Sequence, residues 1–383
     1  MKILVWSILF YLIPLLVCGQ ASNIPVLSER EKDKIDLVFK DFTLETPGYA
    51  IGVSIDGHTV YSNGYGSANL DYKLPITPES SFDIASVSKQ FTAAGIALLI
   101  LNGKLSLETP VSDYIPELSK YADTIRVKHL IYNTSGIVDY YRLPRASGKS
   151  WITFNYFDID ECIETSLSID TLSFKPGSRW DYSNVNFMIL AKIAEAVTGL
   201  PFSVYLKESL FEPLNMTNSF IHDDVTMVIK NRVTPYNPRT EEYVRAYTEE
   251  GINIQNEGQY IQHHRNSPHY GGSGVITTVE DLLKWSKNMI TRNLGGDSFY
   301  NLMHKTLKFN HERDNQALGL YIGSYKGRKI VAWDGGDYGV SSQLLRFPEH
   351  GIAIVVLSNL GSGQAYQKAN EIADILIEEK IIE

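Results

Sequence analysis

Strand-forming patterns lie near both ends of this 383-residue chain and are separated by a long stretch of helical and loop patterns. The strand patterns cover residues 49–55, 58–65, 329–333, 342–347 and 351–357. The first two are joined by Asp56-Gly57, a strong hairpin signal. Because the strands form two groups and do not alternate with helices, a doubly wound fold fits poorly. The chain is predicted to be α+β, with one antiparallel sheet built from both termini and a large, mainly helical inserted lobe.

Helices are expected to flank this sheet at both ends of the chain. Ser28-Glu29-Arg30-Glu31 has the pattern of a capping box at the start of the first helix, and residues 365–377 form a closing amphipathic helix. A single domain with two lobes and a cleft between them is therefore predicted. Its expected bounds are 20–383, with a sheet lobe at about 20–85 and 286–383 and a helical lobe at about 86–285.

The N-terminus has the composition of a secretory signal peptide. Residues 3–17 form an apolar run behind Lys2, and small residues follow at a plausible cleavage site after Gly19. The run is shorter than a typical membrane-spanning helix, so an uncleaved membrane anchor is the less favoured interpretation. Residues 1–19 are predicted to be removed and the protein exported, to the periplasm or outside the cell. A lipid anchor at Cys18 is the alternative.

The rest of the composition excludes several classes of partner. The formal net charge is −9, which argues against nucleic acid and anionic membrane surfaces. Cys18 and Cys162 are the only cysteines, so no intrachain disulfide is expected after cleavage.

Residues 221–270 are polar and nearly aperiodic, as in a surface loop that covers a site. The three histidines of this loop, His263, His264 and His269, are expected to be solvated. Neither a metal nor another cofactor is predicted.

The strongest candidate for chemistry lies within residues 82–101. From Ser86 onward this stretch is predicted to be a buried helix that stops at Asn102-Gly103. Ser86 and Lys89 are three residues apart and share one face of its first turn. The helix N-terminus and burial both favour a neutral lysine, which can act as a base for a serine nucleophile. About one Ser-x-x-Lys match is expected by chance in a chain of this length, so the motif alone leaves a structural role open.

A second candidate is Tyr182-Ser183-Asn184, which precedes a helix predicted over residues 187–197. A phenol near a lysine can pass a proton to a leaving group, and an amide can hold a substrate carbonyl. The same tripeptide also occurs as Tyr61-Ser62-Asn63 inside the predicted hairpin. At least one copy must therefore be structural.

A third candidate is Trp333-Asp334-Gly335-Gly336, placed after a predicted strand. Glycines let a backbone approach a ligand closely, and Trp333 and Gly335 are candidate substrate-binding residues. The backbone N–H of Gly336 could form an oxyanion hole with that of Ser86. The alternative is a strand-end turn with a half-buried tryptophan.

The three motifs, in this order, resemble the serine β-lactamase and penicillin-binding-protein superfamily. The resemblance is strongest to class C β-lactamases, D-alanyl-D-alanine peptidases and family VIII carboxylesterases, and it runs from about residue 28 to the end. It is carried by residues 64–66, 82–92, 105–107, 129–136, 175–177, 180–184, 212–216, 271–281 and 335–342.

The resemblance implies a role for each catalytic candidate. Ser86 is the expected acylated nucleophile, Lys89 its base partner and Tyr182 the second proton carrier, while Asn184 orients the substrate. The sequence has no assignable equivalent of the glutamate base found in one class of the superfamily.

Two departures from the family pattern bear on function. Asn133 stands where relatives usually have the histidine of His-Thr-Ser-Gly, which is expected to alter a supporting loop. Trp333 stands where β-lactamases and peptidases carry Lys or His to meet the substrate's carboxylate. Trp-x-Gly occurs among family VIII esterases, so this departure favours esters or amides without a carboxylate. Arg346 is an alternative cation for such a carboxylate.

The sequence therefore predicts an exported serine hydrolase that forms a covalent acyl-enzyme on Ser86. Its expected partners are small-molecule esters, amides, β-lactams or peptides, and carboxylester hydrolysis is the leading activity. A β-lactamase or D-alanyl-D-alanine carboxypeptidase is the alternative enzyme. A non-catalytic protein that binds peptidoglycan or acts as a scaffold is the alternative of another class, weakened by the presence of all three catalytic candidates.

Overall fold

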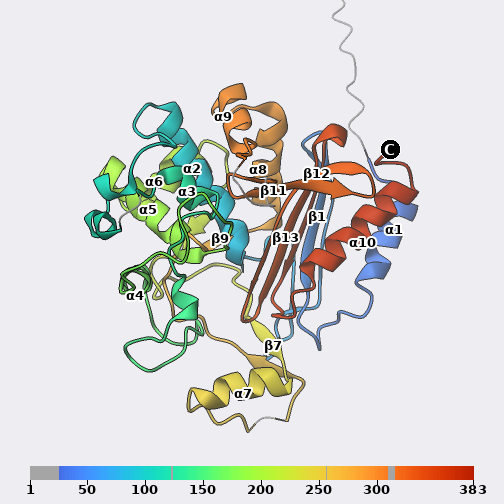
Figure 1. Cartoon of the computed structure of the whole chain (residues 1–383). Helices are drawn as coiled ribbons and strands as arrows, with labels where there is room; N and C mark the ends of the chain where they lie inside the picture. Colours follow the sequence, from blue (N-terminus) through green and yellow to red (C-terminus); the bar gives the residue numbers. More distant parts are fainter. Residues whose placement is uncertain (1–25, 122–123, 256, 309–314) are drawn as a thin grey trace, which may run out of the picture.

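The computed structural model describes residues 26–121, 124–255, 257–308 and 315–383 (Figure 1). The predicted signal peptide, residues 1–19, and Cys18 lie outside the described residues.

A seven-stranded antiparallel sheet unites the two ends of the chain, with the strand order β10-β11-β12-β13-β14-β1-β2. Its strands are β1 (Tyr49–Ile55), β2 (His58–Tyr65), β10 (Gln316–Ala317), β11 (Leu320–Tyr325), β12 (Arg328–Asp337), β13 (Val340–Phe347) and β14 (Ile352–Ser358). The N-terminal strand β1 pairs with the C-terminal strand β14, from Tyr49↔Ser358 to Ile55↔Ile352. This pairing confirms the predicted α+β fold with a sheet built from both termini.

Two features of the sheet differ from the prediction. The prediction ended one strand at Trp333, whereas β12 continues through the glycines to Asp337 and forms a hairpin with β13. The prediction also missed β10 and β11. Only Leu320 is fully buried along β11, and Gly323 interrupts it, so the strand's apolar pattern is weak.

Helices cover both faces of the sheet (Figure 1). The helices α1 (Glu29–Val38) and α10 (Ala365–Glu378) pack against each other on one face, and the predicted capping box at Ser28 is present. On the other face, α8 (Val279–Thr291) packs on β1 and β14. This helix runs across residue 285, where the helical lobe was expected to end. Thr278 caps α8 by accepting a hydrogen bond from the backbone of Asp281.

The inserted lobe is mainly helical. Its α-helices are α2 (Lys89–Leu101), α3 (Val127–Ile131), α4 (Ile159–Leu167), α5 (Asn184–Thr198), α6 (Phe202–Leu206) and α7 (Glu241–Glu249). A further helix, α9 (Gly296–Met303), follows α8 in the chain. Shorter helical turns are Ala85–Ser88, Val111–Asp113, Pro116–Lys120, Tyr140–Arg142, Lys207–Phe211 and Pro348–His350. Three small sheets contain β3 (Ser67–Asn69) with β4 (Leu74–Pro75), β5 (Phe82–Asp83) with β9 (Val275–Thr277) and β6 (Phe220–Ile221), and β7 (Tyr236–Pro238) with β8 (Tyr260–Gln262).

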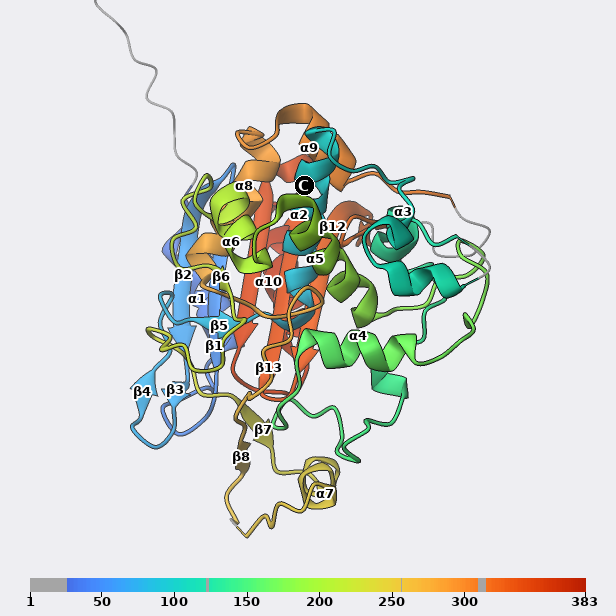
Figure 2. The ribbon, with the colours of Figure 1, turned by 90° about the vertical axis from the view of Figure 1, so that its left-hand side faces the viewer.

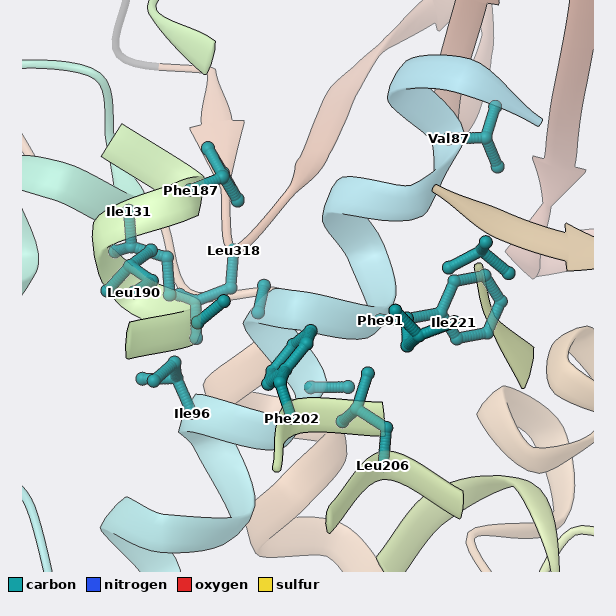
Figure 3. Packing of buried hydrophobic residues seen from close by; sticks show 14 of the residues in the cluster. Val87, Phe91, Ile96, Ile131, Phe187, Leu190, Phe202, Leu206, Ile221 and Leu318 are labelled. Carbon is teal, nitrogen blue, oxygen red and sulfur yellow. The ribbon is translucent and has the colours of Figure 1, made fainter. Parts of the chain in front are cut away.

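Helix α2 is the centre of the core between the lobes. Every residue from Lys89 to Leu99 is buried. Figure 3 shows Phe91 and Ile96 among apolar side chains of other segments, including Phe187 of α5 and Phe202 of α6. A helix that is apolar on all sides must be enclosed by protein. The core therefore encloses Lys89 at the first turn of α2.

The segment 221–270 is more ordered than the predicted surface loop. It forms β6, β7, α7 and β8, and the last three project from the body of the molecule as an arm (Figure 2). The prediction of solvated histidines is wrong for His263 and His269, which are only 1% and 4% exposed. The ring of His263 stacks on Tyr338, and His269 stacks on Phe157, contacts that depend on packing and not on local sequence. His264 is exposed as expected.

Within the described part of the chain, no single helix has both the length and the apolar character needed to span a membrane; the pair Asn184–Thr198 and Phe202–Phe211 meets both criteria together but is bent by 81°. Among the same residues no group of three or more His, Cys, Asp or Glu side chains could hold a metal ion.

Candidate active site

Ser86 lies in a tight helical turn, Ala85–Ser88, immediately before α2. The prediction placed it inside the helix itself. The preceding residue, Ala85, has φ +44°, a left-handed conformation that residues with a Cβ rarely adopt. The side chain of Asp83 accepts a hydrogen bond from the Ala85 N–H at 2.8 Å and supports this turn. Backbone strain next to Ser86 is typical of functional sites.

Lys89 and Tyr182 both contact the Ser86 hydroxyl. The Tyr182 hydroxyl lies 2.6 Å from Ser86 Oγ, and Lys89 Nζ lies 3.1 Å from the same atom. Tyr61, from the other copy of the tripeptide, lies on β2 and contacts Asp36 instead. The geometry therefore confirms which copy joins Ser86.

The amine of Lys89 is held by two further groups that can only accept hydrogen bonds. Nζ donates to Asn184 Oδ1 at 2.8 Å and to the carbonyl of Gly272 at 2.6 Å. A neutral amine has two N–H bonds and one lone pair. When the amine is neutral and these two acceptors take both N–H groups, its lone pair is left to face Ser86 Oγ; the charged amine donates to the same oxygen.

Burial also favours the neutral form of this amine. Burial lowers the pKa of Lys89 from 10.5 to about 7, although the negative charges of Asp139 and Asp334 raise it. A base whose pKa lies near neutral pH is well matched to proton abstraction. Burial has the opposite consequence for Tyr182, whose phenol pKa is raised above its usual value of 10.0, so that it stays protonated at neutral pH.

Asp139 positions the second tripeptide, and no motif in the sequence predicted this role. Its carboxylate accepts hydrogen bonds from the Ser183 hydroxyl at 3.0 Å, from the Val185 N–H at 3.2 Å and from the Asn184 N–H. These donors form the start of α5, whose first N–H groups have no acceptor within the helix. Asp139 is 45 residues away from Asn184 in the chain, so no local pattern reveals the contact.

Asn133 supports the same loop from another side. It is fully buried, and its carbonyl accepts a hydrogen bond from the Asp181 N–H at 2.9 Å. Its side-chain oxygen lies 3.3 Å from the Ser183 N–H. The departure from the family pattern at this position therefore falls in a supporting loop, as predicted.

The hairpin of β12 and β13 brings Gly336 to Ser86. Asp337 pairs with Val340 across a two-residue loop, so this pair exchanges both backbone hydrogen bonds and the next pair, Gly336↔Ser341, exchanges none. The Gly336 N–H therefore points away from β13, on the side where the pairing of β11 ends at Ala332. The N–H of Ser86 lies at the start of a helical turn, where intrahelical acceptors are lacking. These two donors form a candidate oxyanion hole.

Gly335, a candidate substrate-binding residue in the sequence, lines neither of the two cavities at Ser86. A Cβ at this position would lie 3.0 Å from the Ser86 nitrogen and 2.4 Å from the Ile84 carbonyl oxygen. Glycine is therefore needed for β12 to approach the turn that carries Ser86. The residue packs against that turn, while Gly336 lines the neighbouring cavities.

Two cavities meet at Ser86, Tyr182 and Gly336. The first has a volume of about 580 Å³, and its lining includes Asn184, His269, Ser273, Tyr141, Tyr243, Tyr338, Glu242 and Asp337. The second has about 430 Å³ and adds Trp180, Tyr321, Trp333 and Asp334. Trp333 thus borders the cavity beside Ser86. Arg346 lines neither cavity.

The charges around the cavities are mainly negative. Among the described residues that line them there is no Lys or Arg, whereas Glu242, Asp334 and Asp337 all contribute carboxyl groups. The nearby cation Arg265 is 8% exposed and is already paired with Asp83 at 2.5 Å and Asp337 at 3.3 Å. Apart from Lys89, the described site therefore offers no free cation to a substrate.

Comparisons with known proteins identify the family of this chain. A family model described as Beta-lactamase matches residues 35–378. The chain belongs to the beta-lactamase family. This assignment confirms the predicted enzyme class, a serine hydrolase of the β-lactamase-like superfamily.

Curated relatives in this family include proteins with different names. The chain is 28% identical over 335 residues to penicillin-binding protein 4* of Bacillus subtilis, covering 82% of this chain and 68% of the relative. It is 25% identical over 331 residues to D-aminopeptidase of Gluconobacter oxydans, covering 86% of this chain and 59% of that protein.

Solved structures show the same fold. D-amino acid amidase from Ochrobactrum anthropi has a TM-score of 0.75 at 19% identity, covering 91% of this chain and 99% of that one. The octameric penicillin-binding protein homologue from Pyrococcus abyssi has a TM-score of 0.73 at 24% identity, covering 92% of this chain and 77% of that one.

Proposed function

We propose that this protein hydrolyses esters or amides that carry no carboxylate beside the scissile bond, through an acyl-enzyme on Ser86. Lys89 Nζ takes the proton of Ser86 Oγ while Oγ bonds to the substrate carbonyl carbon. The N–H groups of Ser86 and Gly336 hold the oxygen on which negative charge develops. When the bond to the leaving group breaks, Tyr182 passes the leaving group a proton and regains one from the protonated Lys89, so that both residues return to their starting forms. Water then attacks the acyl carbon, releases a carboxylic acid and returns the proton to Ser86.

The observation that carries the proposal is the environment of Trp333. Its indole borders the cavity at Ser86 together with Asp334, in the position where the family pattern has a cation. An indole offers an apolar surface and one N–H donor, which cannot neutralise a carboxylate. Asp334 beside it disfavours an anion further. Neutral short-chain esters are therefore the leading substrate class, and carboxylester hydrolysis is the leading activity.

A second candidate substrate class is an amide or ester with a free amino group. The first cavity supports it, because Glu242 adds a carboxyl group to its lining and Tyr243 and Tyr338 add aromatic rings. Carboxylates and aromatic faces both attract an ammonium group. The name D-aminopeptidase, carried by one relative, is consistent with this class. A β-lactamase or D-alanyl-D-alanine carboxypeptidase activity remains the alternative.

A substrate panel on the purified protein tests the proposal. It comprises short-chain nitrophenyl esters, a D-alanine nitroanilide with a free amine, a chromogenic cephalosporin and a D-Ala-D-Ala peptide. We expect the neutral esters to be hydrolysed well and the two carboxylate-bearing substrates poorly. The Trp333→Lys variant should improve turnover of the carboxylate-bearing substrates relative to esters, by about 1–3 kcal/mol in transition-state stabilisation. Efficient cephalosporin hydrolysis by the unmodified protein would overturn the proposal.

Labelling with a fluorescent fluorophosphonate separates an enzyme from a scaffold. An activated serine is phosphonylated, whereas an unactivated one is not. We expect labelling of the wild-type protein and none of Ser86→Ala. A wild-type protein that is folded but not labelled would favour the non-catalytic alternative.

We also propose that the protein is exported after removal of residues 1–19, on the composition of that segment. N-terminal sequencing of protein recovered from the periplasm or the medium should begin at Gln20. Acylation at Cys18 would instead support the lipid-anchored alternative.

A further inference from the structure

A second charged site lies away from Ser86, around Arg346 on β13. This side chain is 4% exposed, and it lies at a cavity of about 410 Å³ that shares no lining residue with the two cavities at Ser86. Its Nη2 donates to Gln90 Oε1 on α2 at 3.1 Å. Arginine stays protonated in proteins, so this contact leaves a full positive charge inside the molecule.

The remaining donors of this guanidinium have no partner. Among the described residues, Arg346 Nε and Nη1 make no hydrogen bond, and neither does Gln90 Nε2. The hydroxyl of Ser286, which lines the same cavity, is also without a partner. Burial lowers the pKa of Arg346 from 12.5 to about 10, which reflects the cost of holding the charge there. Buried charges in proteins are normally paired, so unpaired donors beside a cavity indicate a missing acceptor.

The lining of the cavity limits what this acceptor can be. The other arginine of the lining, Arg292, already contacts Asp297 and stacks on Tyr300. Asp56 and Glu349 line the same cavity and disfavour a multiply charged anion. A volume of about 410 Å³ leaves room for a small organic molecule.

We propose that this cavity binds a small monocarboxylate, with the carboxylate accepting hydrogen bonds from Arg346. A carboxylate matches the planar donors of a guanidinium, and its single charge suits a lining that includes Asp56 and Glu349. Ser286 supplies a further donor on the cavity wall, and apolar parts of Met289, Ile290 and Val331 line the space around it. The site is separate from the reaction at Ser86, so the proposal does not depend on the substrate of the enzyme.

Acetate is the probe that tests this site. Titrating acetate against chloride at constant ionic strength should raise the melting temperature of the wild-type protein saturably, because a ligand that binds only the folded state stabilises it. Calorimetry should give one acetate per chain. Sulfate and inorganic phosphate are the comparison arms, and we expect each to bind at least tenfold more weakly than acetate.

Two variants locate the effect. Arg346→Met, which keeps an unbranched apolar stem without the guanidinium, should weaken acetate binding more than tenfold. Arg245→Gln, at an exposed position on α7, removes one positive charge elsewhere and should leave binding unchanged. A saturable response that is the same in Arg346→Met and wild type would overturn the proposal, as would an equal loss in Arg245→Gln.

A measurement on the wild-type protein covers the case in which Arg346→Met does not fold. Crystals grown with and without acetate should differ by planar density within hydrogen-bond distance of the Arg346 guanidinium. Water alone at that position in both crystals, or no saturable stabilisation by acetate in solution, would refute the site.

Discussion

The same three residues, Tyr-Ser-Asn, occur at two places in this molecule and serve different ends. Tyr61-Ser62-Asn63 lies on β2, where the hydroxyl of Tyr61 and the amide of Asn63 both contact the carboxylate of Asp36. Tyr182-Ser183-Asn184 lies at the start of α5, where its side chains reach Ser86 and Lys89. The tripeptide does not determine the chemistry, because the groups that tertiary structure places beside it differ.

The acidity of the two phenols does not distinguish them either. Burial, with a hydrogen bond to Asp36, raises the pKa of Tyr61 to about 12, and burial raises the pKa of Tyr182 as well. What differs is the neighbouring base. Tyr61 faces a carboxylate, whereas Tyr182 shares a serine hydroxyl with an amine whose pKa is about 7. A proton can therefore move between Ser86 and Tyr182 or Lys89 during a reaction, whereas Tyr61 contacts Asp36 and Tyr65 instead of a serine.

The largest expected effect on turnover comes from removing the Ser86 hydroxyl, which Tyr182 of the second tripeptide contacts. Ser86→Ala should lower kcat by about three to six orders of magnitude, because the acyl-enzyme cannot form. The matched control is Ser62→Ala, an exposed position in the first tripeptide, which should retain wild-type turnover. Circular dichroism should show both variants folded. A Ser86→Ala protein with substantial activity would place the nucleophile elsewhere.

The next effect compares the two phenols directly. Tyr182→Phe should lower kcat by about a hundredfold to ten-thousandfold, the usual contribution of a positioned acid or base. Tyr61→Phe removes the same oxygen from the other copy and should leave kcat and KM unchanged. Steady-state kinetics on the best ester of the panel would measure both. Equal losses in the two variants would show that the phenols act through stability.

A pH–rate profile tests the base beside Tyr182. Since Lys89 acts as its neutral amine and its pKa is about 7, kcat/KM should rise about tenfold per pH unit below pH 7 and level off above it. The profile of Tyr61→Phe should match that of the wild type. A plateau extending below pH 6 would mean that Lys89 is not the titrating base.

The smallest expected effect concerns the carboxylates that hold the tripeptides. Asp139→Ala removes the acceptor of Ser183 and of the first N–H groups of α5, and should cost about 1–3 kcal/mol of unfolding free energy. It should also lower kcat severalfold, because Asn184 and Tyr182 lose their fixed positions. Asp36→Ala should reduce stability without changing kcat. Urea denaturation and kinetics on both variants separate these outcomes.

Local patterns in the sequence determined several elements of the fold. Alternation and a tight turn predicted the β1–β2 hairpin, spaced apolar residues predicted α10, and the capping signal at Ser28 was correct. The pairing of Ser86 with Lys89 was also visible, since residues three apart share one face of a helical turn. All of these depend on interactions between residues that are close in the chain.

Only the tertiary structure decided which distant groups complete the site. Asp139 at the start of α5 and the carbonyl of Gly272 on Lys89 are contacts between residues 45 and 183 positions apart. Their positions depend on how α2, α5 and the Gly271–Gly274 segment pack, and the energy of that packing is spread over many side chains. The burial that lowers the pKa of Lys89 is likewise a property of the whole core. The sequence identified the reactive groups, and their reactivity depends on the fold that encloses them.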